Sequence, residues 1–265
     1  MSRLFLSFNA VVVVATSVLL ASCSSAQVLQ ALVPRATEDD RARAAELIAG
    51  VCEEEAGEFV YDTASNVEGF LLLPNATYGN GRDQPATEIR SAGCGAHCLR
   101  YFVSGYAYLE ANVTAYPRPS GIGDDFEVGT GRHRYELELR KGENCKVYDR
   151  IRRHNQLIQQ LERENPDLLG GKCLVARRVG NFQSRYGYQH SFLEPAFKLA
   201  DDLVGNKRGS RVIDLTTGRD MAVNVGISAH KPGVQSHHIA SCGAAFTVKI
   251  TKVLQPIQPS GGERQ

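Results

Sequence analysis

The sequence has no tryptophan, only two methionines and no surplus of charge of either sign among its 265 residues. Lysine and arginine total 30 and aspartate and glutamate total 29, so the chain lacks the overall basic character of a dedicated nucleic-acid-binding protein. With 43% hydrophobic and 22% charged residues, its composition is that of a globular protein. Composition therefore excludes a wholly disordered chain and a multi-span membrane protein, predicts no nucleic-acid partner, and indicates no ligand.

Long apolar runs are also scarce, and the longest one lies at the N-terminus between Leu4 and Ala21. It follows Arg3, which is the only charged residue among the first 34. A charged start followed by an apolar stretch is typical of a secretory signal peptide. Polar residues interrupt the run, and it is marginal against the roughly 20 apolar residues that a spanning helix needs. The sequence therefore predicts a signal peptide over residues 1–22.

Directly after this run, Leu20-Ala21-Ser22-Cys23 resembles the lipobox of bacterial lipoproteins. The resemblance implies cleavage before Cys23, acylation of that residue, and a membrane anchor formed by its lipid. Ser24 in the next position implies sorting to the outer membrane, with the protein facing the periplasm. The alternative is plain secretion to the periplasm, because Ser24-Ser25-Ala26 also offers the small residues that a general signal peptidase reads.

An even number of cysteines remains after Cys23, and an even number in an exported chain favours disulfide bonds. Six cysteines allow about 15 pairings, among which the sequence alone does not choose. Within Cys94-Gly95-Ala96-His97-Cys98, a zinc site would use both cysteines, His97 and one distant ligand. Disulfides are favoured over that site. The candidate disulfide residues are Cys52, Cys94, Cys98, Cys145, Cys173 and Cys242.

Helical periodicity is strongest after Thr37, which is placed to cap a helix over residues 38–56. A second helix is expected along residues 147–161, with His154 on its apolar stripe. A third is expected over residues 191–204, where Ser191 and Glu194 have capping-box spacing. The predicted organisation is a tether over residues 23–36, one domain over 37–254 and a flexible tail over 255–265.

Alternating apolar and polar residues predict about seven strands, two of which form a hairpin that turns near Gly218. Residues 64–66 are expected to form a turn between the first two strands. No repeated strand–helix–strand rhythm is present, so we expect an α+β fold with a mainly antiparallel sheet, about three helices and stabilising disulfides. The expected strands cover residues 59–62, 69–73, 101–113, 133–139, 173–179, 212–215, 222–227 and 246–250.

A short block around the first predicted strand resembles a segment of proteobacterial envelope proteins to which no activity is assigned. It covers less than a tenth of the chain and implies a place in the cell envelope, but no function. The matching residues are Cys52, Ala56, Gly57, Glu58, Tyr61, Thr63, Val67, Glu68 and Gly69.

The densest group of reactive side chains is formed by His230, His237, His238 and Cys242. Neighbouring histidines in an extended segment point to opposite faces, so His237 is expected near Cys242, or His230 near His238. These histidines are the candidate ligands for zinc or copper and the candidate residues of a hydrolase. The chain has no G-x-S-x-G and no H-E-x-x-H motif, so no catalytic residue and no cofactor are predicted.

The sequence thus favours a lipid-anchored, non-catalytic envelope accessory or binding module with a possible envelope protein as partner. The alternative is an envelope hydrolase or metal-binding protein that uses His230, His237 and His238. A pocket that gathers these histidines with serine or a carboxylate would favour the enzyme. Exposed aromatic residues such as Tyr186 and Tyr188 would favour the binding module.

Overall fold

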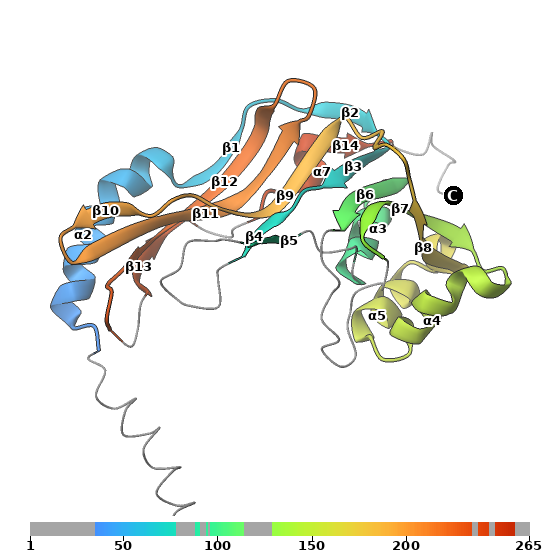
Figure 1. The fold of residues 1–265 in the computed structure, drawn as a ribbon, viewed down its shortest axis with the longest axis horizontal. Coiled ribbons are helices and arrows are strands. Elements are labelled where there is room, and N and C mark those ends of the chain that lie inside the picture. The colour runs from blue at the N-terminus through green and yellow to red at the C-terminus, as the bar shows by residue number, and fades with distance from the viewer. Residues whose placement is uncertain are drawn as a thin grey trace, which may run out of the picture.

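The computed structural model describes residues 35–77, 88–90, 94, 96–113, 129–234, 238–243 and 247–257. The fold is α+β, built on a ten-stranded, mostly antiparallel sheet with the order β1-β12-β11-β9-β3-β6-β7-β8, in which β10 also pairs with β11 and β13 with β12 (Figure 1). These strands are β1 (Gly57–Val60), β3 (Gly69–Leu72), β6 (Tyr108–Val113), β7 (Gly131–Leu139), β8 (Lys172–Arg178), β9 (Tyr186–Leu193), β10 (Phe197–Ala200), β11 (Leu203–Asp214), β12 (Arg219–His230) and β13 (His238–Cys242).

Two small sheets and six α-helices complete the described part of the chain. The small sheets pair β2 (Ala64–Val67) with β14 (Leu254–Pro256) and β4 (Asn75–Thr77) with β5 (Glu88–Arg90). No helix in the described ranges is both long and apolar enough to span a membrane. The helices are α2 (Glu38–Glu55), α3 (Leu99–Val103), α4 (Lys146–Arg152), α5 (Gln156–Glu164), α6 (Pro166–Leu169) and α7 (Ile250–Val253), with 3-10 turns η1 (Ala96–Cys98) and η2 (Gly142–Cys145).

The long hairpin of β11 and β12 extends to one end of the molecule, where β10 and β13 pair with it. Helix α2 packs on it through Ala44 and Ile48, which share an apolar cluster with Leu203 and Ala229. At the other end, α3 to α6 lie beside β6, β7 and β8 (Figure 1). A larger apolar cluster fills that part, where the ring of Phe70 meets the ring of Tyr106 edge to face at 5.0 Å between centroids. The molecule is therefore elongated, with a separate apolar cluster toward each end.

Three disulfides resolve the pairing that the sequence left open. They join Cys52 to Cys242, Cys94 to Cys98, and Cys145 to Cys173, with Cα–Cα distances of 6.0, 5.6 and 5.7 Å. The first fastens α2 to β13, and the third fastens η2 to β8. Disulfide bonding of all six cysteines is thus confirmed.

Several predicted elements are confirmed. Helix α2 begins after a complete capping box, in which Thr37 accepts from the Asp40 amide at 3.1 Å and Asp40 accepts from the Thr37 amide at 2.9 Å. Strand β7 is present with His133 and Tyr135 buried as the alternation predicts, but Leu139 at its end is 57% exposed. The hairpin is also present, with Gly218 in its turn at φ 70°, but its strands are twelve residues long. The sequence underestimated their length because polar residues continue along both strands.

The predicted helix over residues 191–204 is wrong, since this segment forms the end of β9, all of β10 and the start of β11. The capping-box spacing of Ser191 and Glu194 is a local signal, and pairing with distant strands overrides it. Phe197 lies opposite Gly205 in the β10–β11 pair. A Cβ at Gly205 would lie 2.3 Å from the Phe197 ring, so the glycine makes room for that ring.

The predicted helix over residues 147–161 is two helices, α4 and α5, and the number of helices exceeds three because the short helices α3, α6 and α7 were not predicted. Asn155 separates the two helices because its side chain caps the N-terminus of α5, accepting from the Ile158 amide at 3.1 Å. His154 therefore lies in the exposed link rather than on an apolar stripe. Val147, at the start of the predicted helix, is 37% exposed.

Four shorter predictions also differ from the structure. Residues 101–103 end α3 and only residues 108–113 form the predicted strand, because Phe102 turns into the core on a helical segment. Residues 64–66 belong to β2 rather than a turn, since they pair with β14. The last predicted strand, over residues 246–250, is wrong in its described part, because residues 247–249 belong to no strand and Ile250 begins α7; residue 246 lies outside the described ranges. Gln255 and Pro256, assigned to the tail, complete β14.

Candidate functional site

The clearest functional feature is a separation of charge along the molecule. Residues 131–178, which form β7, α4, α5, α6 and β8 and are called the basic lobe below, contain twelve basic and seven acidic residues. The ion pair of Arg134 with Glu110 of neighbouring β6 cancels one charge of that surplus. A net charge near zero for the whole chain thus hides a cationic end.

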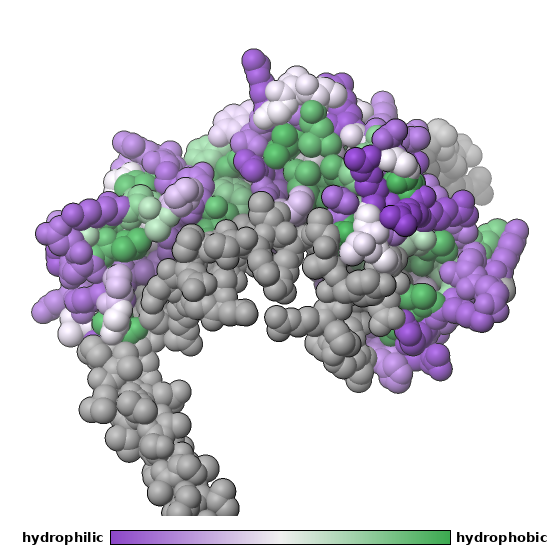
Figure 2. All heavy atoms as spheres, viewed as in Figure 1, coloured by the Kyte–Doolittle hydropathy of each residue, from purple (hydrophilic) through white to green (hydrophobic). Residues whose placement is uncertain are grey.

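The surface of the basic lobe presents its charges on a short helix beside apolar side chains. Lys146 and Arg150 of α4 and Arg153, which caps its C-terminus, follow one another at spacings of four and three residues, and all three are exposed. Lys146 pairs with Glu143, and Arg153 donates to the Asp149 carbonyl at 3.3 Å. Leu139 is 57% exposed and Val147 is 37% exposed nearby in the chain. Figure 2 shows hydrophilic residues, in purple, beside scattered hydrophobic ones at this end of the molecule. Such a surface combines long-range attraction with apolar contact.

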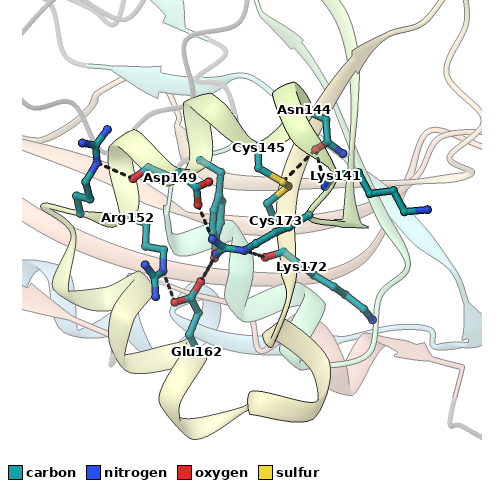
Figure 3. A network of polar contacts seen from close by, with 11 residues as sticks. Lys141, Asn144, Cys145, Asp149, Arg152, Glu162, Lys172 and Cys173 are labelled. Atoms are coloured by element: carbon teal, nitrogen blue, oxygen red, sulfur yellow. Dashed lines mark hydrogen bonds and ion pairs between the residues drawn. A yellow bond between two sulfur atoms is a disulfide. The ribbon is translucent and has the colours of Figure 1, made fainter.

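A network of polar contacts holds the framework of this surface (Figure 3). The Arg140 guanidinium donates to Asp149 at 2.6 Å and to Glu162 at 2.9 Å, and its Nε donates to the Lys172 carbonyl at 3.0 Å. Glu162 also pairs with Arg152, which raises the pKa of that guanidinium. The Cys145–Cys173 disulfide closes the same region. Arg140 and Arg152 are thus neutralised by carboxylates within the lobe, while the side chains of Lys146, Arg150 and Arg153 are exposed to solvent.

The opposite end of the molecule is acidic. Helix α2 has seven acidic and two basic residues and lies at the far end from α4 and α5 in Figure 1. Lys231 donates to Asp40 at 2.5 Å, and this bond, with that of the Thr37 amide, lowers the pKa of Asp40 to about 2. Lys207 pairs with Glu55. These pairs reduce the acidic charge of this end without cancelling it.

A buried carboxylate connects the basic lobe to the rest of the sheet. Glu110 on β6 is fully buried and accepts from Arg134 at 2.7 Å, from the Gln183 and Ser184 amides, and from the Ser184 hydroxyl at 2.6 Å. Burial raises the pKa of this carboxyl, but the hydrogen bonds from Ser184 and Arg134 outweigh burial and hold the pKa below its usual value. Both oxygens of the Glu110 carboxylate therefore have hydrogen-bond partners, which is typical of a structural ion pair.

The histidines predicted as a possible site are only partly brought together. His230 ends β12, and its Nε2 lies 2.8 Å from the Ser228 hydroxyl on the same strand. His238 is opposite His230 in the β12–β13 register, as one of the two expected arrangements required. His237 lies outside the described residues, and Cys242 is bonded to Cys52. Within the described ranges, no three His, Cys, Asp or Glu side chains are grouped to hold a metal.

The structure argues against the zinc site considered for Cys94, His97 and Cys98. Its two cysteines are bonded to each other, so their sulfurs are not available as thiolate ligands. His97 and His154 line one pocket of about 410 Å³, but no free thiolate accompanies them there. Two imidazoles without the thiolates fall short of the four ligands of a structural zinc site.

Exposure of Tyr186 and Tyr188, which would have favoured a binding module, is not observed. Tyr188 is buried, its hydroxyl lies 3.3 Å from Nδ1 of His190, and burial raises the pKa of the phenol. Tyr186 is half-buried beside Arg185. Tyr61, at 64% exposed, is instead an aromatic residue open to solvent. Strand register, which the sequence does not reveal, decides which tyrosines face the core.

The anchor residue Cys23 lies outside the described ranges, and so does the whole predicted signal peptide. The basic lobe was missed by the sequence analysis because only the net charge of the whole chain, which is near zero, was considered. The charge excess over residues 131–178 was the available signal. Comparison of the chain with protein-family models, with curated proteins and with solved structures finds no match.

Proposed function

We propose that this protein is a lipid-anchored, periplasm-facing binding module whose basic lobe contacts an anionic polymer of the cell envelope. The anchor is Cys23, in the lipobox of Leu20, Ala21, Ser22 and Cys23. A multiply acylated cysteine supplies the two or more chains that stable membrane attachment needs. The outer membrane, with the domain facing the periplasm, is the location that Ser24 implies.

The single observation that carries the proposal is the charge separation between α2 and the basic lobe. Helix α2 follows the anchor and the tether directly in the chain, so the basic lobe is at the end of the domain remote from α2. A local surplus of lysine and arginine concentrates anionic partners near its surface. The carboxylate-bearing cell wall is an anionic polymer that a periplasm-facing protein meets, and carboxylates pair well with arginine.

The test is sedimentation of the mature protein with purified cell-wall sacculi at low and high salt. Wild-type protein should co-sediment at low salt and be released as the salt concentration rises, because exposed charges are screened. The test variant carries Lys146→Glu, Arg150→Glu and Arg153→Glu together. Since it reverses the sign of the charge on the α4 face, its apparent affinity should fall by about tenfold or more.

The control variant carries Arg41→Glu, Lys198→Glu and Arg219→Glu, three exposed residues outside the basic lobe. It changes the net charge of the chain by the same amount, so it should bind sacculi like the wild type if the location of the charge matters. Equal loss in both variants, or no binding by the wild type, refutes the proposal. Preferential binding to duplex DNA, anionic lipid vesicles or an acidic envelope protein would also refute it.

The hydrogen bond between Ser228 and His230 favours a second candidate, an envelope hydrolase. A serine nucleophile needs a neighbouring base, and the 2.8 Å contact supplies one. The fluorophosphonate probe used for serine hydrolases should label wild type and lose that labelling in Ser228→Ala and His230→Gln if this candidate is correct. A binding module should show no labelling. A serine beside a histidine is not sufficient for a hydrolase, which also needs an oriented base and an oxyanion hole.

A further inference from the structure

A separate pocket of about 260 Å³ lies where β2, the end of α3 and the α7–β14 segment meet. It is lined by residues from three parts of the chain that are far apart in sequence. Its size is slightly below the range of ligand pockets, which begins at about 300 Å³, so it has room for a small ligand or one unit of a larger one. The lining residues are Ser65, Asn66, Ser104, Thr251, Gln255 and Pro256.

Contacts between the three segments fix the walls of this pocket. Strand β14 runs parallel to β2, with Leu254 opposite Ala64, and the buried Tyr106 hydroxyl donates to the Leu254 carbonyl at 2.5 Å. Gly105, at φ 106°, follows Ser104 and approaches Pro256 so closely that a Cβ would lie 3.3 Å from the proline ring. The end of α3 is thereby held against β14.

The backbone of β2 is adapted to the pocket at Asn66. Asn66 has φ 58°, the one non-glycine residue in the left-handed region among the described residues. Asparagine tolerates this conformation better than most residues, and such outliers gather at ligand-binding positions. Next to it, the Ser65 hydroxyl donates to Oε1 of Gln255 at 3.1 Å, which links the two strands across the pocket.

The chemistry of the lining selects the kind of ligand. Three hydroxyl groups and two carboxamides form its polar part, and no charged side chain lines it. The Ser65 hydroxyl already donates to Gln255 and the Ser104 hydroxyl donates to the Arg100 carbonyl at 2.8 Å, so these two hydroxyls offer acceptors to a ligand. A hydroxyl such as that of Thr251 and a carboxamide such as that of Asn66 can both donate and accept, so the lining matches a ligand that carries hydroxyl groups. A pocket without charge gives no advantage to an ion over water. The Pro256 ring offers an apolar wall for the C–H face of a sugar.

We infer that this pocket binds one unit of an uncharged, hydroxyl-rich carbohydrate. A peptide main chain also donates and accepts, but it brings no hydroxyl groups to match those of Ser65, Ser104 and Thr251. The inference goes beyond the proposed function, because it uses none of the residues of the basic lobe. Refutation of the carbohydrate pocket would therefore leave the proposed function of the basic lobe unaffected, and the reverse is also true.

The experiment uses the neutral trisaccharide of N-acetylglucosamine as probe and saturation-transfer NMR with the mature protein as readout. Wild type should transfer saturation to the sugar, and amide shifts should change at residues 65, 66, 104, 251 and 255. Asn66→Gly removes the carboxamide while retaining the left-handed backbone, and Thr251→Val replaces a hydroxyl by a methyl of similar size. Each should weaken binding by about tenfold, as expected for one lost hydrogen bond.

Thr63→Val is the matched control, because it makes the same hydroxyl-to-methyl change at an exposed residue outside the pocket lining. It should bind the trisaccharide like the wild type, and so should the α4 charge-reversal variant. Absence of transfer to the wild type, equal transfer to Asn66→Gly, or shift changes elsewhere overturns the inference. A blocked alanine dipeptide that competes with the trisaccharide at the pocket overturns it in favour of a peptide ligand.

Discussion

The three disulfides should contribute very differently to stability, because they close loops of very different length. Cys52 and Cys242 are 190 residues apart in sequence, whereas Cys94 and Cys98 are four residues apart. A bridge acts mainly by restricting the unfolded chain, so the longer loop gives the larger effect. We therefore compare the double variants Cys52→Ala/Cys242→Ala and Cys94→Ala/Cys98→Ala.

Loop-closure entropy gives about 5 kcal/mol for the Cys52–Cys242 bridge and about 2 kcal/mol for the Cys94–Cys98 bridge. For a domain of this size, each kcal/mol corresponds to about 2 to 4 °C in melting temperature. Cys94 and Cys98 are fully buried, while Cys52 and Cys242 are partly exposed, so loss of the sulfur atoms penalises the short-loop variant more. That penalty narrows the difference in stability between the two variants.

The slope of urea unfolding distinguishes the two effects, because burial acts on the native state and loop closure acts on the unfolded chain. Removing the Cys52–Cys242 bridge lets the unfolded chain expand, so the m-value should rise clearly. Removing the Cys94–Cys98 bridge should leave the m-value unchanged within error. Urea unfolding followed by circular dichroism measures both. A larger loss of stability in the short-loop variant with equal m-values in both would refute the reasoning.

Three further predictions concern ionic contacts and the anchor. Glu110→Gln should lower the free energy of unfolding by about 2 to 3 kcal/mol in urea titrations, since it leaves Arg134 without its buried carboxylate, while the half-exposed Glu136→Gln should cost less than about 1 kcal/mol; equal costs would contradict this. The pKa of Asp40 is about 2 in the fold against an ordinary value of 3.8, so its stabilising effect is complete above that ordinary value and is lost as the pH falls toward 2. Asp40→Asn should therefore flatten the acid side of a stability–pH profile, and an unchanged profile would argue against the Lys231 contact. Metabolic palmitate labelling should be lost in Cys23→Ala, and equal labelling of the wild type and this variant would refute the lipid anchor at Cys23.

Elements with strong local signals could be predicted from the sequence. The cap at Thr37 and the acidic residues after it specify α2, since a helix start depends on neighbours three residues away. The alternation along β7 and the turn at Gly218 are equally local. The even number of cysteines indicated disulfides, but their pairing depended on which distant segments meet.

Only the tertiary structure decided the candidate sites. The carbohydrate pocket joins Asn66, Ser104 and Gln255, and no local pattern relates residues that lie so far apart in the chain. Residues 197–204 form strands because β11 gives them a pairing partner, and Tyr188 is buried because the register turns it toward Phe70. Local sequence determines where helices begin and hairpins turn, because those contacts span a few residues. Long-range pairing determines which faces are buried and which charges gather at one end, because the free energy of these contacts exists only after folding brings the segments together.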